Sequence, residues 1–264
     1  MNILFIGGTG IISTACTELV LARGMTVTLL NRGQSARPTP GGAQVLTADI
    51  RNPKAAQAAL GNQIFDAVVD FISFTPEHIE AALALFAGRT GQYVFISSAS
   101  AYHKPVLTLP ITEETPLHNP YWAYARDKIA CEARLLQAYL SDGFPVTIVR
   151  PSHTYDQTLL PFRGGFTIIE RLRRGLPLLV HGDGTSLWTL THHRDFAPGL
   201  VGLLGNGAAL GEAFHITADG ALPWNEIGRL LCAAVGVPNA ELVHAPSDVI
   251  AQYDPDWGAS LLGD

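Results

Sequence analysis

The chain has 264 residues, 47% of them hydrophobic and 15% charged, so it can bury one large core or a core with a smaller lobe. Its net charge of −6, with no Lys or Arg run longer than the pair Arg173-Arg174, argues against a nucleic-acid partner. No apolar stretch approaches the roughly 20 residues of a membrane span, and three scattered cysteines favour a reduced, cytoplasmic protein.

The first part of the chain alternates short apolar runs with stretches of helical periodicity. The apolar runs lack polar alternation, as strands buried on both faces do. These runs are Ile3–Ile6, Val27–Leu30, Ala67–Asp70, Tyr93–Ser97 and Val146–Val149. The helical stretches are Thr14–Arg23, Lys54–Leu60, Glu77–Phe86 and Tyr121–Ser141. The alternation predicts an α/β fold with a doubly wound parallel sheet, the Rossmann arrangement.

The alternation of strands and helices becomes less regular after Arg150-Pro151, and we expect a domain boundary near residue 160. The sheet domain then covers residues 1–160, and a smaller lobe, interleaved with the first domain, covers residues 161–264. Further helices are expected in the second part at Phe166–Arg174, Phe196–Leu204 and Trp224–Val235.

A glycine-rich turn, Gly7-Gly8-Thr9-Gly10, separates the first strand from the first helix. No charged leader precedes that strand, so no signal peptide is expected. At such a turn, backbone amides and the positive end of a helix can bind a dinucleotide pyrophosphate. The spacing departs from the usual pattern only at Ser13, where a third glycine normally allows close packing. A turn that binds no ligand is the alternative.

The residues after the second and third strands indicate the adenosine end of such a cofactor. Asn31 and Arg32 stand about 20 residues after the glycines, where the ribose is recognised. An Asp there would favour NAD, whereas Asn31 is neutral and Arg32 can pair with a 2′-phosphate, so NADP is slightly favoured over NAD. An exposed loop arginine is the alternative. Asp49 and Ile50 suit an adenine contact, although Asp49 could instead cap the turn that follows.

Tyr124 and Lys128 are four residues apart on a predicted helix, so their side chains leave the same face. A nearby ammonium lowers the pKa of a phenol from about 10, which suits Tyr124 to general acid–base catalysis. A packed ring beside a solvated charge is the alternative. Ser97 ends the preceding predicted strand, and Ser98 and Ser100 follow it at the sheet edge where ligands bind. One of these three hydroxyls could contact the substrate oxygen.

Together these motifs resemble the extended short-chain dehydrogenase/reductase family, in its NAD-dependent epimerase/dehydratase group. The resemblance covers nearly the whole chain. It rests on Gly7-Gly8-Thr9-Gly10-Ile11-Ile12, Asp49-Ile50, the segment Phe95 to Tyr102, Tyr124-Ala125-Arg126-Asp127-Lys128 and Arg150-Pro151. It implies NAD(P)-dependent hydride transfer at a hydroxyl or carbonyl carbon of a sugar, nucleotide sugar or related small molecule.

The resemblance also implies roles for individual residues. It selects Ser98 as the catalytic hydroxyl, with Tyr124 as general base and Lys128 on the cofactor ribose. The expected cofactor contacts are Gly7, Thr9, Gly10, Ile11, Ile12, Asn31, Arg32, Asp49, Ile50, Phe71, Ile72, Lys128 and Pro151. The expected substrate contacts are Ser98, Ser100, His153 and Trp188. Homodimerisation through the helix that carries Tyr124 and Lys128 is implied as well.

Further departures from the family pattern concern the substrate. Residues 98–100, Ser-Ala-Ser, lack the Asp-Glu pair that related enzymes use in sugar dehydration, so dehydration is disfavoured. Trp188 falls where family members commonly place an arginine on a nucleotide diphosphate. A nucleotide sugar is therefore doubtful unless Arg163, Arg171 or Arg194 substitutes. The chain also ends some tens of residues earlier than family members usually do, so a reduced substrate lobe is expected.

The sequence also raises two other hypotheses. A metal site could draw on His181, His192, His193 or His215, but adjacent histidines in a strand point to opposite faces, so none is expected. The protein could instead be a non-catalytic dinucleotide-binding sensor or a nucleic-acid-associated relative. The acidic composition and the complete set of serine, tyrosine and lysine argue against that alternative.

Overall fold

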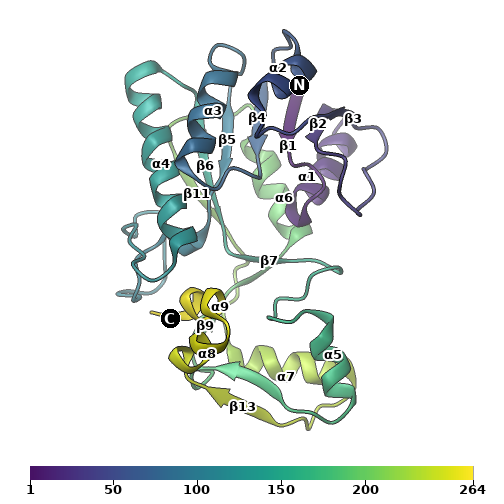
Figure 1. The fold of residues 1–264 in the computed structure, drawn as a ribbon, viewed down its shortest axis with the longest axis vertical. Coiled ribbons are helices and arrows are strands. Elements are labelled where there is room, and N and C mark those ends of the chain that lie inside the picture. The colour runs from purple at the N-terminus through teal and green to yellow at the C-terminus, as the bar shows by residue number, and fades with distance from the viewer. Residues whose placement is uncertain (264) are drawn as a thin grey trace.

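Seven parallel strands form the central sheet in the computed structural model of the protein, which describes residues 1–263 (Figure 1). In spatial order they are β11 (Ala213–Ile216), β6 (Val146–Pro151), β5 (Tyr93–Ile96), β4 (Ala67–Asp70), β1 (Asn2–Ile6), β2 (Thr26–Asn31) and β3 (Gln44–Thr47). The chain winds from β1 toward β3 and then from β4 toward β6, so the direction reverses beside β1. Ligands of such sheets bind at the carboxyl ends of the strands near this reversal. The predicted doubly wound parallel sheet is confirmed.

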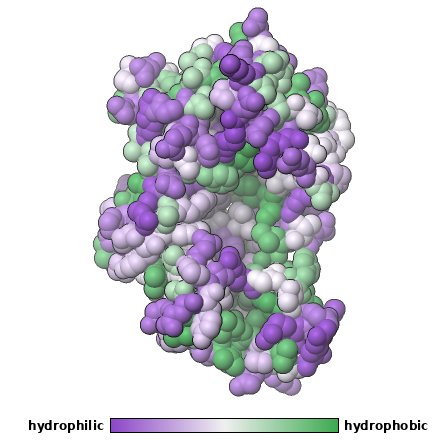
Figure 2. All heavy atoms as spheres, viewed as in Figure 1, coloured by the Kyte–Doolittle hydropathy of each residue, from purple (hydrophilic) through white to green (hydrophobic). Residues whose placement is uncertain are grey.

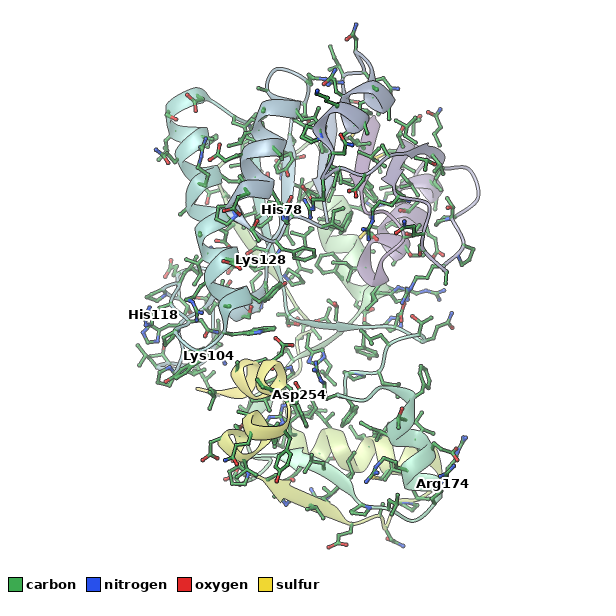
Figure 3. The ribbon with its side chains drawn as sticks, in the orientation of Figure 1. His78, Lys104, His118, Lys128, Arg174 and Asp254 are labelled. Atoms are coloured by element: carbon green, nitrogen blue, oxygen red, sulfur yellow. The ribbon has the colours of Figure 1, made fainter. Side chains whose placement is uncertain are left out.

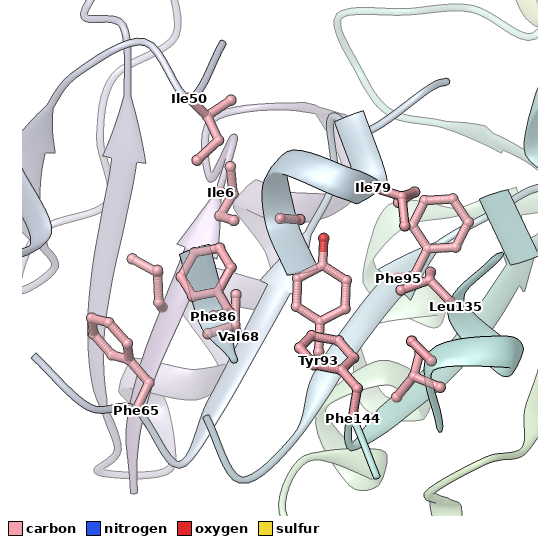
Figure 4. Close-up of a cluster of buried hydrophobic side chains, with 14 of the residues drawn as sticks. Ile6, Ile50, Phe65, Val68, Ile79, Phe86, Tyr93, Phe95, Leu135 and Phe144 are labelled. Carbon is pink, nitrogen blue, oxygen red and sulfur yellow. The ribbon is translucent and has the colours of Figure 1, made fainter. Parts of the chain in front are cut away.

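Helices cover both faces of the sheet, which explains why its strands are apolar throughout. On one face, Ile3 and Phe5 pack with α1 (Ile11–Ala22) and α6 (His193–Leu203). On the other face, Leu4 and Ile6 belong to the cluster drawn in Figure 4. The helices on that second face are α2 (Pro53–Leu60), α3 (Pro76–Phe86) and α4 (Ala123–Asp142).

A smaller part of the chain lies below the carboxyl ends of the sheet in Figure 1. Its helices are α5 (Phe166–Arg173), α7 (Trp224–Val235), α8 (Ser247–Tyr253) and α9 (Pro255–Leu261). Its strand pairs are β8 (Leu178–His181) with β13 (Leu242–Ala245), and β9 (Leu187–Trp188) with β12 (Leu222–Pro223). Its own core contains Leu172, Leu178, Val180, Trp224, Ile227 and Cys232. We call this part the lower lobe.

The chain passes between the sheet and the lower lobe more than once. It leaves β6 through β7 (His153–Tyr155), which pairs with β10 (Leu190–His192). After β8 and β9 it returns as α6 and β11 and then re-enters the lobe. Residues 193–216 therefore lie with the sheet, so a division at residue 160 marks only the first crossing.

The histidine pair at the start of α6 differs from the prediction. The ring centroids of His192 and His193 are 4.6 Å apart, so the expectation that they point to opposite faces is wrong. The reason is that His192 ends β10 and His193 begins α6, so strand alternation does not continue across them. Within residues 1–263, no group of three or more His, Cys, Asp or Glu side chains could hold a metal ion. Of the helices described, none is long and apolar enough to cross a membrane.

Candidate active site

A cleft of about 390 Å³ lies at the carboxyl ends of β1, β4 and β5 and joins the two groups of predicted residues. In Figure 2 the surface is hollowed between the sheet and the lower lobe. The cleft is lined by these predicted cofactor or catalytic residues: Gly7, Gly10, Ile11, Ile12, Phe71, Ile72, Ser98, Tyr124, Lys128 and Pro151. Segments more than a hundred residues apart in the sequence therefore share one cavity.

The glycine turn brings its backbone close to the cleft. Gly7 has a φ of +86°, and a Cβ atom there would lie 2.5 Å from Cγ2 of Ile72. A Cβ on Gly8 would lie 2.5 Å from Cδ2 of Leu29, so neither position has room for a side chain. The first amides of α1, at Ile11 and Ile12, precede the first intrahelical hydrogen bond. This geometry fits a pyrophosphate group.

Ser13 holds this turn through its hydroxyl. The side chain is fully buried, donates to the Gly7 carbonyl oxygen at 2.8 Å and accepts from the Gly10 amide at 2.7 Å. The serine that replaces a glycine therefore fixes the shape of the turn. It also occupies the amide of Gly10, which leaves the amides at the start of α1 as the open donors.

The predicted adenosine contacts lie outside the lining of this cleft. Asn31 accepts a hydrogen bond from the Gly8 amide at 3.0 Å, so its side chain supports the turn. Arg32 is exposed, as its alternative interpretation expected. The Asp49 carboxylate accepts from the Arg51 amide at 2.9 Å, which forms a local turn. Ile50 lines a separate cavity of about 260 Å³.

Arg51 is a residue near the adenosine end that the sequence prediction missed. Its guanidinium donates to the Ile72 carbonyl oxygen. Burial lowers the pKa of Arg51, the carboxylates of Asp70 and Asp49 raise it, and Arg32 lowers it. Arg32 and Arg51, which follow β2 and β3, are therefore close enough to affect each other electrostatically. The feature of the sequence that could have identified Arg51 is its position directly after Asp49-Ile50.

A buried ion pair links the loop after β2 to the segment after β7. Arg37 contacts the Asp156 carboxylate at 2.5 Å, and the Asp156 side chain is only 3% exposed. The same guanidinium also reaches Thr158. Burial acts to raise the pKa of Asp156, but the hydrogen bonds from Arg37 and Thr158 outweigh it and hold that pKa well below its ordinary value.

The catalytic candidates Ser98 and Tyr124 both line the cleft and lie close enough for the Ser98 hydroxyl to act on the Tyr124 phenol. Ser98 precedes the short helix η1 (Ala99–Ala101), and its oxygen accepts from the Ser100 amide at 3.1 Å and from the Ser100 hydroxyl at 2.8 Å. Burial raises the pKa of the Tyr124 phenol, and the Ser98 hydroxyl acts against it. The phenol is therefore protonated at neutral pH.

The predicted lowering of the Tyr124 pKa by Lys128 is not what the geometry gives. Lys128 is 1% exposed, and its ammonium donates to the carbonyl oxygens of Ser73 and Ile96, both at 2.7 Å. The ammonium lies 5.8 Å from the centroid of the Tyr124 ring. Burial of the phenol outweighs an ammonium that is held by carbonyl groups, so the net shift is upward. Burial also lowers the pKa of Lys128 to about 8.

A second buried ion pair holds α4 against the sheet behind these residues. Arg150 on β6 contacts Glu132 on α4 at 2.6 Å, and both side chains are almost fully buried. The Ser97 hydroxyl donates to the same Glu132 carboxylate. This pair joins the end of β5, which leads into Ser98, to the helix that carries Tyr124 and Lys128.

The predicted substrate residues His153 and Trp188 contact each other in the lower lobe. The Trp188 indole donates to Nδ1 of His153 at 3.0 Å, so the neutral histidine carries its proton on Nε2. Trp224 packs against both rings, with centroids 5.7 Å from Trp188 and 6.3 Å from His153. Burial lowers the pKa of His153 to about 4. This aromatic cluster is neutral at physiological pH, although the Lys104 ammonium lies over Trp188 at 5.7 Å.

The structure places none of the three possible substitute arginines at Trp188. Arg163 is paired with Asp254 and Asp256, and Figure 3 shows Asp254 at the junction of the two parts. Arg171 and Arg194 are exposed. Figure 3 places Arg174, which directly follows the helix carrying Arg171, at the far edge of the lobe.

The chain is similar in sequence to several known proteins. A model of the NAD dependent epimerase/dehydratase family matches residues 3–217. The chain is 29% identical over 257 residues to the chloroplast stem-loop binding protein of 41 kDa b of Arabidopsis thaliana, which covers 92% of this chain and 65% of that protein. It is 26% identical over 274 residues to 2′-dehydrokanamycin reductase of Streptomyces kanamyceticus, which covers the whole chain and 72% of that enzyme.

Solved structures share the fold. A dTDP-glucose 4,6-dehydratase from Bacillus anthracis, in complex with NAD, superposes with a TM-score of 0.78 at 19% identity, covering 93% of this chain and 84% of that one.

Proposed function

Since the chain belongs to the NAD-dependent epimerase/dehydratase family, we propose that it catalyses hydride transfer between a nicotinamide dinucleotide and a hydroxyl or carbonyl carbon of a small molecule. One observation carries the proposal. The glycine turn and the side chains of Ser98, Tyr124 and Lys128 line a single cleft. A pyrophosphate at the turn and a reacting carbon at Tyr124 can therefore belong to one bound complex.

The bound nicotinamide would supply or accept the hydride. Tyr124 transfers a proton to or from the substrate oxygen, Ser98 hydrogen-bonds that oxygen, and Lys128 holds the cofactor ribose. Because burial keeps the phenol protonated, Tyr124 can donate its proton to a carbonyl oxygen as the carbon receives the hydride. In the reverse reaction the ionised Tyr124 acts as the base.

The substrate in this proposal is a sugar or related small molecule, and one without a nucleotide diphosphate is preferred. The neutral pair of His153 and Trp188 supports this choice because neither ring can neutralise a diphosphate. The relative that reduces 2′-dehydrokanamycin is named for a substrate of the preferred class.

For the cofactor, we propose NADP over NAD. The last residue of β2 is the neutral Asn31, and two cationic side chains, Arg32 and Arg51, lie close enough to it and to each other to act on a 2′-phosphate. Fluorescence titration with NADPH and NADH tests this choice. Arg32→Ala should weaken NADPH binding roughly tenfold, by the loss of about one charge-assisted hydrogen bond, and leave NADH binding unchanged. Equal weakening of both would refute the preference.

The test of the reaction is Tyr124→Phe. This variant removes the proton donor and keeps the ring, so dinucleotide binding should survive while turnover falls by roughly 10²- to 10⁴-fold. Tyr121→Phe is the matched control, since that exposed tyrosine lies just before α4 and does not line the cleft. Candidate substrates can be found by mass spectrometry of small molecules that co-purify with the protein. Unchanged turnover in Tyr124→Phe would remove Tyr124 from the mechanism, and the absence of dinucleotide binding would overturn the proposed function.

Similarity to a stem-loop binding protein supports a second candidate, a dinucleotide-binding protein that associates with nucleic acid. The chain covers 65% of that relative, and its net charge of −6 works against phosphate contacts. Gel-shift titration with a stem-loop RNA, with and without dinucleotide, separates the two. Binding that survives Tyr124→Phe would favour this second role.

We also propose a homodimer through α4. Leu140 on this helix is 83% exposed, which is compatible with a partner surface. Light scattering of the wild type and of Leu140→Glu tests it, since a buried charge at the interface should shift the mass to that of a monomer.

A further inference from the structure

We propose that Asp70 is a positioning residue for Lys128: it fixes the turn whose carbonyl oxygen holds the lysine ammonium, and it places a buried negative charge behind that ammonium. Asp70 ends β4 and is 1% exposed. The inference rests on the proposed function only in that Lys128 is taken to hold the cofactor beside Tyr124.

The Asp70 carboxylate accepts four hydrogen bonds, three from the turn after β4 and one from Tyr93 on β5. One oxygen accepts from the amides of Ile72 and Ser73, both at 2.9 Å. The other accepts from the Ser73 hydroxyl at 2.7 Å and the Tyr93 hydroxyl at 2.6 Å. In Figure 4 the Tyr93 ring lies within the apolar cluster beside Phe144 and carries its hydroxyl at the far end. Each carboxylate oxygen therefore accepts from two donors, and a carboxylate can do this because both of its oxygens are acceptors.

The same turn holds the ammonium of Lys128. Ser73 gives its amide and hydroxyl to Asp70, and its carbonyl oxygen accepts from Lys128 at 2.7 Å. The Ile96 carbonyl oxygen accepts a second hydrogen bond from the same ammonium. An ammonium has three protons, so one remains for the cleft that Lys128 lines. A turn without Asp70 would lose the bonds that aim the Ser73 carbonyl.

The negative charge of Asp70 differs from that of Glu132, the other carboxylate near Lys128, in the donors that surround it. The titratable and charged groups that face Lys128 are Asp70, Arg51 before α2, His78 on α3, and Tyr124, Cys131 and Glu132 on α4. The Glu132 carboxylate is neutralised by Arg150. The Asp70 carboxylate takes its hydrogen bonds from neutral donors, so its negative charge remains to act on the lysine.

The direction of this electrostatic effect follows from the burial of Lys128. Burial lowers the pKa of Lys128 to about 8, and the Asp70 charge acts to raise it. Without that charge the lysine would lose its proton at a lower pH. A neutral amine would then face Tyr124 and the cofactor ribose.

The test uses the full chain without cofactor. The sequence contains three lysines, Lys54, Lys104 and Lys128, so a protein labelled with ¹³C-lysine gives three resolvable side-chain signals. Lys128→Arg and Lys104→Arg assign them. We expect the Lys128 signal to titrate near pH 8 in the wild type, and Asp70→Asn to move its midpoint down by roughly one pH unit. The Lys104 signal should not move.

Tyr93→Phe is the matched control because it removes one donor from the Asp70 carboxylate and keeps the charge. Its Lys128 midpoint should stay close to that of the wild type. Thermal melting checks that each variant folds. If Asp70→Asn does not fold, Asp70→Ser is used, since it is smaller, neutral and still offers an acceptor to the Ser73 amide. A folded neutral variant with an unchanged Lys128 midpoint overturns the proposal.

A second measurement follows dinucleotide-dependent turnover against pH. In the neutral variant the decline of activity at high pH should begin at a lower pH than in Tyr93→Phe, whereas a merely destabilised variant would lose activity equally at every pH. The proposed function and the proposed role of Asp70 can be refuted independently. A wild type that binds no dinucleotide refutes the proposed function, and the lysine titration still reports whether Asp70 controls Lys128.

Discussion

The sheet side of the molecule and the side of the lower lobe are built in different ways. On the sheet side, Lys128 is held by main-chain carbonyl groups and Glu132 by a buried guanidinium. On the lobe side, His153, Trp188 and Trp224 are held by contacts between rings, and the two titratable groups of that cluster, His153 and the neighbouring His181, both have a pKa of about 4. The proposed catalytic side chains therefore depend on the backbone of the fold, whereas the proposed substrate side chains depend on contacts between rings that can be exchanged without altering the sheet.

The buried pair on the sheet side gives the largest expected effect on stability. Glu132→Gln leaves the Arg150 guanidinium buried without its charge partner, so the free energy of unfolding should fall by about 3–5 kcal/mol. Glu80→Gln is the control, because its pair with Arg134 is exposed and should cost under about 1 kcal/mol. Chemical denaturation measures both. Equal losses would mean that the buried pair does not anchor α4.

An intermediate effect is expected where the two sides are joined by Arg37 and Asp156. Arg37→Ala leaves a buried carboxylate without its strongest donor, and the free energy of unfolding should fall by about 1–3 kcal/mol at neutral pH. Because Arg37 depresses the pKa of folded Asp156, this stabilisation is complete above the unfolded value of about 3.9 and is lost as the pH falls through the folded pKa.

Denaturation at neutral and acidic pH should therefore show a gap between wild type and Arg37→Ala that narrows in acid. A gap that is constant with pH would assign the loss to packing alone. Arg163→Ala, which breaks a more exposed pair at the other end of the junction, is the comparison variant.

The smallest effect is expected on the lobe side. Trp188→Phe removes the hydrogen bond to His153 and keeps an aromatic ring, which should cost about 1 kcal/mol. Long-range ¹H–¹⁵N spectra should show His153 in the Nε2-protonated form in the wild type and a mixture of tautomers in the variant. Trp122→Phe also removes an indole donor, to Asp256, and should leave the His153 signals unchanged. A wild-type His153 that is charged at pH 6 would contradict the neutral cluster.

Local spacing in the sequence predicted much of the fold and part of the site. Apolar runs, the glycine turn and the interval between Tyr124 and Lys128 depend on neighbours along the chain, and so the sheet was predicted correctly and these residues line one cleft. Partners that are distant in sequence were not predictable in this way. Arg37 and Asp156 are 119 residues apart, and Lys128 is 55 residues from Ser73.

The direction of a pKa shift was also beyond the sequence. Spacing brought Lys128 near Tyr124, but the extent to which each group is buried depends on the packing of α4 against β5 and the turn after β4. For the same reason the sequence did not show that the side chains of Ser13, predicted as a departure from the glycine pattern, and Asn31, predicted as a ribose contact, are hydrogen-bonded to the glycine turn.

The repeated crossing of the chain has a consequence for synthesis on the ribosome. The sheet needs β11 at its edge and α6 over α1, and both follow the first lobe segment in the chain. The lobe in turn pairs β8 with β13, which is made more than sixty residues later. Neither part can complete its hydrogen bonds while the other is still untranslated. A fragment that stops at residue 160 would expose the apolar face that Phe196 and Leu200 cover, and would therefore be an unfolded or chaperone-bound species.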